Sequence, residues 1–319
     1  LLRDVIAGSD DMEVAGTASN GVEAIRSVTE LDPDVVTMDI HMPEMDGLTA
    51  LEYIMRKHPR PVVMLSALAQ KGATATLKAL ELGAVDFIAK PSHYPSAVKE
   101  VRDEVVLKIR AAAQASREVL RGRARPGRRG AVATGPGTQA EGKLVVIGAS
   151  AGGPKALAEI MPRFPADAPA AFVIVQHMPG VFTRSFAARL DSISEMRVKE
   201  AEEGEPLRPG TALVAPGGKD LIVAPDPQGG GRVELMDSTN RAGASPRIDT
   251  TMITAAEVYG PLSIGVIMTG MGSDGARGME KIKKNKGMTI AQDEGSSLVF
   301  GMPKAAIEND TWTGWYPWR

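Results

Sequence analysis

The sequence predicts an α/β protein built on doubly wound, mostly parallel sheets, because short apolar runs alternate with helix-like stretches in both halves of the chain. The runs lie at 35–38, 61–65 and 85–89 in the first half, and at 144–148, 172–176, 212–215, 263–269 and 288–291 in the second. Such short runs, rich in β-branched residues, are typical of strands buried on both faces of a parallel sheet. In this architecture, functional sites lie at the carboxyl ends of the strands.

The stretches between these runs have the spacing of amphipathic helices. Apolar residues follow helical spacing over 47–58, and Asn20 is expected to cap another helix, with Glu23 three residues later. In the second half we expect helices at 154–163, 183–190, 252–259 and 276–285. Two further runs, 221–224 and 232–236, flank a segment rich in Pro and Gly, which predicts a β-hairpin.

A change of composition separates two domains, 1–108 and 143–319. The segment 109–142 between them holds seven Arg against two Glu, and its second half is rich in Gly, Pro, Ala and Thr. We interpret this segment as a helix end that continues into a flexible linker. An Arg run could also contact RNA or acidic lipid, but no aromatic residues are interleaved with it, which favours the linker.

Composition excludes several classes of protein. The 319 residues are 43% hydrophobic and 24% charged, which are ordinary values for a globular protein. No apolar run approaches the ~18 residues that span a membrane, and no signal peptide opens the chain. The lack of Cys excludes a thiol nucleophile and Cys-ligated metals, and a net charge of −2 gives no reason to expect nucleic acid.

Three polar residues follow the three apolar runs of the first domain. Asp39, Ser66 and Lys90 each stand at a strand end, so a parallel sheet would bring them to one crevice. A carboxylate can accept a phosphoryl group as an acyl phosphate, while a hydroxyl and an ammonium bind its oxygens. Each residue alone would be a solvated strand end, but the ordered trio favours a phosphate-acceptor site.

These residues, with the segment 38–47 around Asp39, resemble the receiver domain of bacterial and archaeal response regulators. The resemblance covers residues 1–108 and implies a flavodoxin-like fold. It implies that Asp39 is the phosphorylated residue, that Ser66 is the switch hydroxyl and that Lys90 contacts the phosphate.

Receiver domains begin with a strand that ends in two adjacent acids, which bind Mg²⁺. Here residues 1–6 look like the helix that follows this strand, and Asp10 and Asp11 precede 12–18, which looks like the second strand. We therefore expect the first strand and the acid pair to be missing, although the family uses Mg²⁺ for phosphorylation. Without a cation to neutralise the developing charge, acetyl phosphate should phosphorylate this chain inefficiently. A gain of one phosphate in the intact mass would contradict this expectation.

Ser150 lies in a glycine-rich turn between a predicted strand and a predicted helix. The segment 148–152 fits the pattern G-x-S-x-G, in which a sharp turn exposes the hydroxyl of a nucleophile. The same glycine-rich start of a helix suits a phosphate-binding loop. On the motif alone, a nucleophile and a nucleotide-binding loop remain equal alternatives.

Two further strand ends favour the nucleophile. His177, the only His of the second domain, follows 172–175, and Asp274 follows 263–268 on a glycine-rich loop. Ser, His and Asp at three strand ends supply a nucleophile, a general base and a carboxylate that orients the base. The alternatives are a loop histidine and an aspartate that caps the helix 276–285. A dinucleotide-binding protein would place an acid, rather than His177, after its second strand.

Together the motifs resemble the chemotaxis protein-glutamate methylesterase family (CheB), in which a linker joins a receiver to an esterase. The resemblance covers about 1–308. It implies that Ser150 is the nucleophile, His177 the general base and Asp274 its partner.

The resemblance also assigns residues around the expected oxyanion hole. Ala151, Met271 and Gly272 belong to the active-site loops, and the N–H of Met271 is implied to bind the oxyanion. The family commonly has Thr where this chain has Ala151, which affects the expected rate more than the type of reaction. The family pattern at 301–303 is present and is expected to open the last helix.

The family hydrolyses methyl esters of glutamate side chains on chemoreceptors, often with deamidation of glutamines. By resemblance, Ser150 attacks the γ-carbonyl, methanol leaves, and water hydrolyses the glutamyl-enzyme without a metal or organic cofactor. The implied partners are methyl-accepting chemotaxis receptors and a chemotaxis histidine kinase that donates phosphate, with no nucleic acid and no direct membrane insertion. The implied location is the cytoplasm. In the family the unphosphorylated receiver blocks the esterase, and phosphorylation shifts the population toward an open arrangement.

Two other functions remain open, as does the role of the tail. A receiver-regulated module could hold a nucleotide or phosphate in the loop 148–153, which a serine-directed fluorophosphonate label on Ser150 would exclude. A non-catalytic scaffold is the third alternative, and the presence of Ser, His and Asp argues against it. The segment 308–319 holds all three Trp and lacks the closing strand or helix expected from the family, so it is either an altered terminus or a docking tail.

Overall fold

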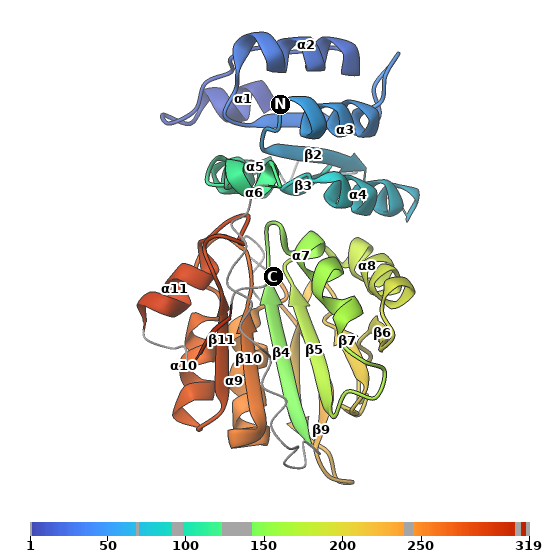
Figure 1. The fold of residues 1–319 in the computed structure, drawn as a ribbon, viewed down its shortest axis with the longest axis vertical. Helices are drawn as coiled ribbons and strands as arrows, with labels where there is room; N and C mark the ends of the chain where they lie inside the picture. The colour runs from blue at the N-terminus through green and yellow to red at the C-terminus, as the bar shows by residue number, and fades with distance from the viewer. Residues whose placement is uncertain are drawn as a thin grey trace. The chain divides into compact units, whose positions relative to one another are not determined.

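A computed structural model describes residues 2–67, 70–90, 98–122, 142–238, 245–309 and 314–316 (Figure 1). The described residues up to 122 fall in one compact unit, and those from 142 onwards fall in a second. Of the predicted linker, the first residues belong to helices and 123–141 lie outside the described residues. None of the described helices is long and apolar enough to cross a membrane.

The first unit alternates helices with three parallel strands, as the sequence predicts. Its elements are α1 (Leu2–Ala7), α2 (Gly21–Leu31), β1 (Val36–Asp39), α3 (Gly47–Lys57), β2 (Val62–Ala67), α4 (Gln70–Leu82), β3 (Asp86–Lys90), α5 (Val98–Ala113) and α6 (Arg117–Leu120). The strands lie in the order β1-β2-β3, so their carboxyl ends meet at one edge. The predicted cap of α2 is confirmed, because the side chain of Asn20 accepts a hydrogen bond from the N–H of Glu23 at 2.9 Å.

The segment 12–18, which the sequence suggests as a strand, forms none. A strand needs a neighbour for its backbone hydrogen bonds, and in a flavodoxin-like sheet the second strand pairs only with the first. Among the described residues, β1 has β2 on one side and no strand on the other. The segment is instead held at its start, where Arg110 of α5 donates two hydrogen bonds to Asp11, at 2.9 and 3.0 Å.

The second unit contains one large sheet and a separate hairpin. Its elements are β4 (Lys143–Ala149), α7 (Gly153–Ile160), η1 (Met161–Arg163), β5 (Ala170–Gln176), α8 (Gly180–Ile193), β6 (Arg197–Glu200), β7 (Thr211–Val214), β8 (Lys219–Pro225), β9 (Gly231–Asp237), α9 (Ile248–Tyr259), η2 (Gly260–Leu262), β10 (Ser263–Ile267), α10 (Ala276–Lys284), β11 (Met288–Gln292), α11 (Met302–Glu308) and β12 (Gly314–Tyr316). The sheet has the order β12-β11-β10-β4-β5-β7-β6, and all of its pairs are parallel. The predicted hairpin is confirmed as the antiparallel pair β8-β9.

Two edge strands of this sheet were not predicted. The sequence of β6 is Arg-Val-Lys-Glu, which has too few apolar residues to be recognised as a strand but suits an exposed edge. At the other edge, β12 pairs with β11, with Trp315 opposite Ala291. The expectation that the tail lacks a closing strand is therefore wrong. Its backbone pairs with β11, although the composition of the tail does not indicate a strand.

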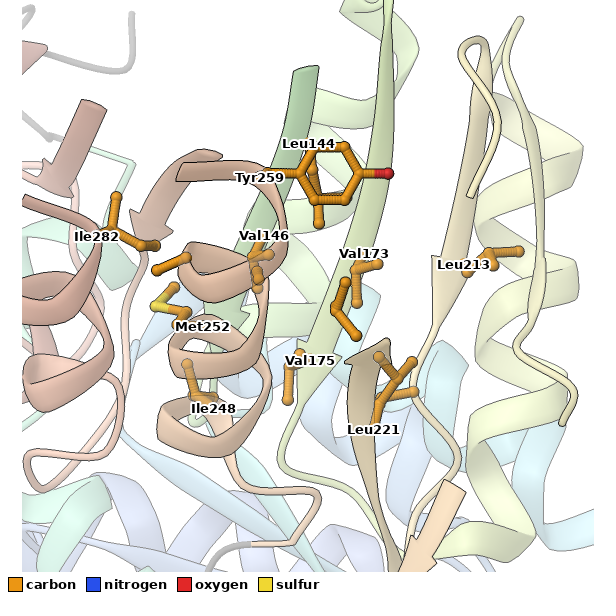
Figure 2. Close-up of a cluster of buried hydrophobic side chains, with 14 of the residues drawn as sticks. Leu144, Val146, Val173, Val175, Leu213, Leu221, Ile248, Met252, Tyr259 and Ile282 are labelled. Carbon is orange, nitrogen blue, oxygen red and sulfur yellow. The ribbon is translucent and has the colours of Figure 1, made fainter. Parts of the chain in front are cut away.

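The main core lies between the sheet and α9, where apolar side chains from both meet. Figure 2 shows Ile248 and Met252 of α9 beside Val146 of β4, and all three side chains are fully buried. Successive strand residues point to opposite faces, so Val145 and Ile147 face the other side of the sheet, and they are buried there too. The sheet is therefore covered on both faces, which explains why its central strands are continuous apolar runs.

The chain order places a topological switch point between β4 and β10. From β4 the chain winds toward β5 and the β6 edge, then returns to place β10 on the other side of β4 (Figure 1). Loops that leave such a pair in opposite directions open a crevice at the carboxyl ends, where open α/β sheets bind ligands. The loops after β4, β5 and β10 are those that carry the candidate residues.

Candidate active site

The receiver-like unit brings two of its three predicted residues together. Asp39 ends β1, Lys90 ends β3, and the two side chains form an ion pair across the end of β2. Ser66 is fully buried, and its hydroxyl accepts a hydrogen bond from Thr76 of α4 at 2.5 Å. In this state the hydroxyl of Ser66 is therefore engaged with α4, while Asp39 and Lys90 neutralise each other at the strand ends.

The described residues do not fit the magnesium site that the receiver resemblance implies. Within the described ranges, no three His, Cys, Asp or Glu side chains gather as a metal site. Asp39 lies at the strand ends, whereas Asp11 is held by Arg110 through two hydrogen bonds. No step of the ester hydrolysis proposed below depends on this metal.

The turn after β4 presents Ser150 at the edge of the sheet. The N–H of Gly153 donates to the carbonyl oxygen of Ser150 at 2.8 Å, which closes the turn that starts α7. Gly152 between them has φ of 77°, a left-handed conformation that favours glycine. Ser150 itself is half-buried, so its hydroxyl can meet a substrate from solvent.

The loop after β10 lies directly against this turn. The N–H of Ser150 donates to the carbonyl oxygen of Thr269 at 3.0 Å. A Cβ added at Gly270 would lie 2.8 Å from the Cβ of Ser150, closer than real Cβ atoms approach. Glycine at 270 is therefore what lets the loop that carries Asp274 approach the serine.

His177 follows β5 and is hydrogen-bonded to Asp274. The N–H of His177 donates to the carbonyl oxygen of Ala149 at 3.0 Å, and its ring Nε2 lies 2.8 Å from Oδ2 of Asp274. The ring nitrogen that faces a carboxylate carries the proton, which leaves Nδ1 as the acceptor. Within the described residues Ser150 Oγ makes no hydrogen bond, so the structure joins His177 to Asp274 but does not join Ser150 to His177.

Asp274 receives two more hydrogen bonds from the start of α9. The N–H of Ile248 donates to Oδ2 at 2.8 Å and the N–H of Asp249 donates to Oδ1 at 2.9 Å. The alternative that Asp274 caps the helix following it in sequence is therefore wrong. The residue at that cap is Gly275, and Asp274 turns back to α9, which the sequence could not reveal because the two segments meet only in the fold.

These contacts set the ionisation of Asp274. Burial alone would raise its pKa, but the hydrogen bond and charge interaction with His177, together with the N–H groups of Asp249 and Ile248, outweigh burial. The pKa of Asp274 therefore lies below its ordinary value. The carboxylate stays ionised at neutral pH, as a group that stabilises a protonated histidine must.

Asp274→Ala should destabilise the second unit in a pH-dependent way. At pH 7 the variant loses a cap of α9, which costs about 1–2 kcal/mol. Because the folded pKa of Asp274 is lowered, its stabilisation is present above the unfolded pKa of about 3.9 and is lost as the pH falls through the folded pKa. Urea unfolding of the unchanged chain and of the variant, followed by circular dichroism, measures this difference. A stability difference that does not shrink below about pH 4 would contradict the account.

Two buried polar side chains, which the sequence did not single out, hold the loops together. Gln176 Nε2 donates to the carbonyl oxygens of Ser150 at 3.0 Å and of His177 at 3.1 Å. Thr269 Oγ1 donates to the carbonyl oxygen of Ala151 at 2.9 Å and accepts from the N–H of Val299 at the same distance. A polar residue at the very end of an apolar strand was the available signal for both.

Hydrogen bonds hold the loop after β10, which carries two of the residues that the resemblance assigns to the oxyanion hole. The carbonyl oxygen of Gly270 accepts from the N–H groups of Gly301 at 3.0 Å and Met302 at 2.8 Å, where α11 begins as predicted. In the part of the chain that the structure describes, the N–H groups of Ala151 and Met271 make no hydrogen bond. Both are therefore free to donate to a substrate oxygen, and Gly272 continues the same loop in a left-handed conformation.

Comparison with known proteins shows the family to which the chain belongs. A family model described as the CheB methylesterase matches residues 145–315, and one described as the response regulator receiver domain matches residues 1–102. The chain belongs to the CheB methylesterase family. The fold class predicted from the sequence is confirmed: a receiver unit is followed by a mostly parallel α/β esterase unit.

Relatives in this family match over almost the whole chain. A protein from Pyrococcus horikoshii named protein-glutamate methylesterase/protein-glutamine glutaminase is 49% identical over 310 residues, which cover 97% of this chain and 84% of the relative. One of the same enzyme name from Syntrophomonas wolfei is 46% identical, covering 97% and 89%. The crystal structure of the CheB methylesterase catalytic domain from Thermotoga maritima is 45% identical, with a TM-score of 0.54 over 56% of this chain and 93% of that one.

Proposed function

We propose that this chain hydrolyses glutamate methyl esters on chemoreceptors and deamidates glutamine side chains there, through Ser150, His177 and Asp274. The observation that carries the proposal is the hydrogen bond between His177 and Asp274, which joins the loops after β5 and β10 on either side of β4, the strand that precedes Ser150. The names of its relatives in the CheB family support the substrate class.

The geometry suggests which nitrogen of the base acts. Asp274 holds Nε2–H of His177, so Nδ1 accepts the proton of Ser150 Oγ as the oxygen attacks the γ-carbonyl. The N–H groups of Met271 and Ala151 stabilise the oxyanion. The protonated histidine then gives its proton to the departing methanol, or to ammonia when the substrate is an amide. Water, activated by the same nitrogen, hydrolyses the glutamyl-enzyme and frees Ser150.

The phosphate-loop alternative fits this turn poorly. A phosphate loop needs several free N–H groups, but those of Ser150 and Gly153 are used within the protein. The side-chain oxygen of Gln176 lies against the backbone of Gly153, is buried and has no hydrogen-bond partner. An acceptor oxygen at this place would repel a phosphate, so the turn favours a nucleophile.

The proposed partners follow from the two units. Methyl-accepting chemotaxis receptors are the substrates, and a chemotaxis histidine kinase supplies the phosphoryl group to Asp39, in the cytoplasm. The receiver unit then regulates the esterase by a shift between blocked and open states. The proposed esterase chemistry uses side chains and main-chain N–H groups of this chain together with water, and needs no metal or organic cofactor.

The proposed function is tested with the full chain and a receptor fragment. The fragment carries radioactive methyl esters on its glutamate side chains, and the measured product is methanol. We expect release that is proportional to the amount of enzyme, and release of ammonia from a fragment with glutamine at the same positions. Absence of methanol release, with a folded enzyme and a methylated fragment, would contradict the proposal.

A further inference from the structure

Asp249 lies in the first turn of α9 and reaches across to the start of α10. Its Oδ1 accepts hydrogen bonds from the N–H groups of Gly275 at 3.0 Å and Gly278 at 2.8 Å. In return, the N–H of Asp249 donates to Oδ1 of Asp274 at 2.9 Å. Asp274 therefore caps α9, which carries Asp249, and Asp249 caps α10, which follows Asp274. This reciprocal pair joins the loop after β10 to α9.

The start of α10 has no other side-chain cap among the described residues. Its cap position is Gly275, in a left-handed conformation with φ of 94°, and a glycine brings no side chain of its own. The loop before it contains glycine at 270 and 272 as well, so its backbone loses much conformational entropy when it is fixed. Asp249 supplies the acceptor that holds the end of this loop, at the residue that follows Asp274 in the sequence.

The start of α9 is itself fixed, so it can act as a platform for the loop. Arg247 precedes α9 and is anchored to Asp220 of β8, a side chain that is 1% exposed. The N–H of Arg247 donates to Oδ1 of Asp220 at 3.0 Å, and its Nε donates to Oδ2 at 2.6 Å. The buried carboxylate of Asp220 therefore fixes the start of α9, and Asp249 transmits this position to the loop that carries Asp274.

We propose that Asp249 is a positioning residue of the esterase, which fixes the loop after β10 so that Asp274 stays aligned with His177. Its hydrogen bonds run to the loop and to the start of α10 rather than to the reacting atoms, so it acts through Asp274 and is not itself catalytic. This inference rests on the proposed ester hydrolysis and deepens it. A misplacement of about 1 Å in such an arrangement can lower a rate about 100-fold.

The electrostatics of the pair identify the informative substitution. Burial raises the pKa of Asp249, and the negative charge of Asp274 adds to this, although the N–H groups of Gly278 and Gly275 oppose it. A neutral side chain of the same shape would therefore be tolerated here. Asp249→Asn keeps the oxygen that accepts both hydrogen bonds and removes only the charge, whereas Asp249→Ala removes the oxygen as well.

The test measures kcat and KM for methyl ester hydrolysis with the full chain and three variants. Asp249→Ala should lower kcat about 10- to 100-fold with KM within about twofold of the unchanged chain. Asp249→Asn should retain at least about a third of kcat, because its hydrogen bonds to the loop persist. The matched control is Asp191→Ala, which removes a carboxylate that accepts the N–H of Val198 at 2.7 Å. Val198 lies near the amino end of the edge strand β6, so this substitution should leave kcat unchanged.

Each outcome decides for or against the proposal. An unchanged kcat in a folded Asp249→Ala variant overturns the proposal. A folded Asp249→Asn variant with a kcat as low as that of Asp249→Ala also overturns it, because the charge rather than the position of the side chain would then matter. If Asp249→Ala fails to fold by circular dichroism, the Asn variant alone decides. If the unchanged chain releases no methanol, the proposed function fails separately. The rate of fluorophosphonate labelling of Ser150 in the same variants then measures the alignment directly.

Discussion

Ser150→Ala should lower the rate of methanol release by about 10⁴-fold or more, while the protein remains folded. In the proposed mechanism the hydroxyl supplies the oxygen that forms the bond to the γ-carbonyl carbon. Only the side-chain oxygen is lost, because the two main-chain groups of Ser150 keep their hydrogen bonds to Thr269 and Gly153. The measurement is methanol release from a methylated receptor fragment, with circular dichroism to confirm the fold.

The control for this variant is Ser192→Ala. Ser192 is an exposed serine of α8 whose hydroxyl donates to the carbonyl oxygen of Arg189 at 2.7 Å, in the same unit but on a helix surface. Its loss should leave methanol release unchanged. Substantial activity in Ser150→Ala would show that another group is the nucleophile.

Asp274→Asn should lower the rate about 10³- to 10⁴-fold with little change in substrate affinity. The carboxylate now accepts from His177 Nε2–H and from the N–H of Ile248 on the same oxygen. Because the N–H of Asp249 occupies the other oxygen, an amide must turn its NH₂ toward a donor in either orientation. When the NH₂ faces His177, Nε2 has to become the acceptor, which moves the ring proton to Nδ1. The histidine can then no longer take the proton of Ser150, although every side chain remains near its place.

The control for charge and size is Asp226→Asn. Asp226 accepts the N–H of Gln228 at 2.8 Å in the turn of the β8-β9 hairpin, away from the loops that carry Ser150, His177 and Asp274. Its substitution should not affect kcat. If Asp274→Asn kept the kcat of the unchanged chain, the tautomer of His177 would not depend on Asp274, and the assigned roles would be wrong.

Most of the central architecture could be predicted because burial on both faces leaves a direct mark on the sequence. The strands β4, β5 and β10 are continuous apolar runs, and a polar residue that directly follows a buried run marks the carboxyl edge. Edge strands carry no such mark. Three of the four residues of β6 are charged, and β12 is recognised only through its backbone pairing with β11.

The contacts within the site could be predicted less well than its members. Ser150 and Asp274 are 124 residues apart, and which helix Asp274 caps depends on how α9 packs against α10. The same holds for Gln176, which joins two loops through one amide, and for Asp249. Sequence spacing identifies local caps such as Asn20, where acceptor and donor are three residues apart, but not caps between distant segments.

The most direct test of the assigned site is covalent labelling of the full chain with a fluorophosphonate, followed by peptide mapping. We predict a single adduct on Ser150 that forms readily in the unchanged chain and is strongly slowed by His177→Ala, because the histidine activates the serine that attacks phosphorus. An adduct on a different residue, or no adduct on Ser150 while methanol is released, would contradict the assignment of Ser150 and His177 as nucleophile and base.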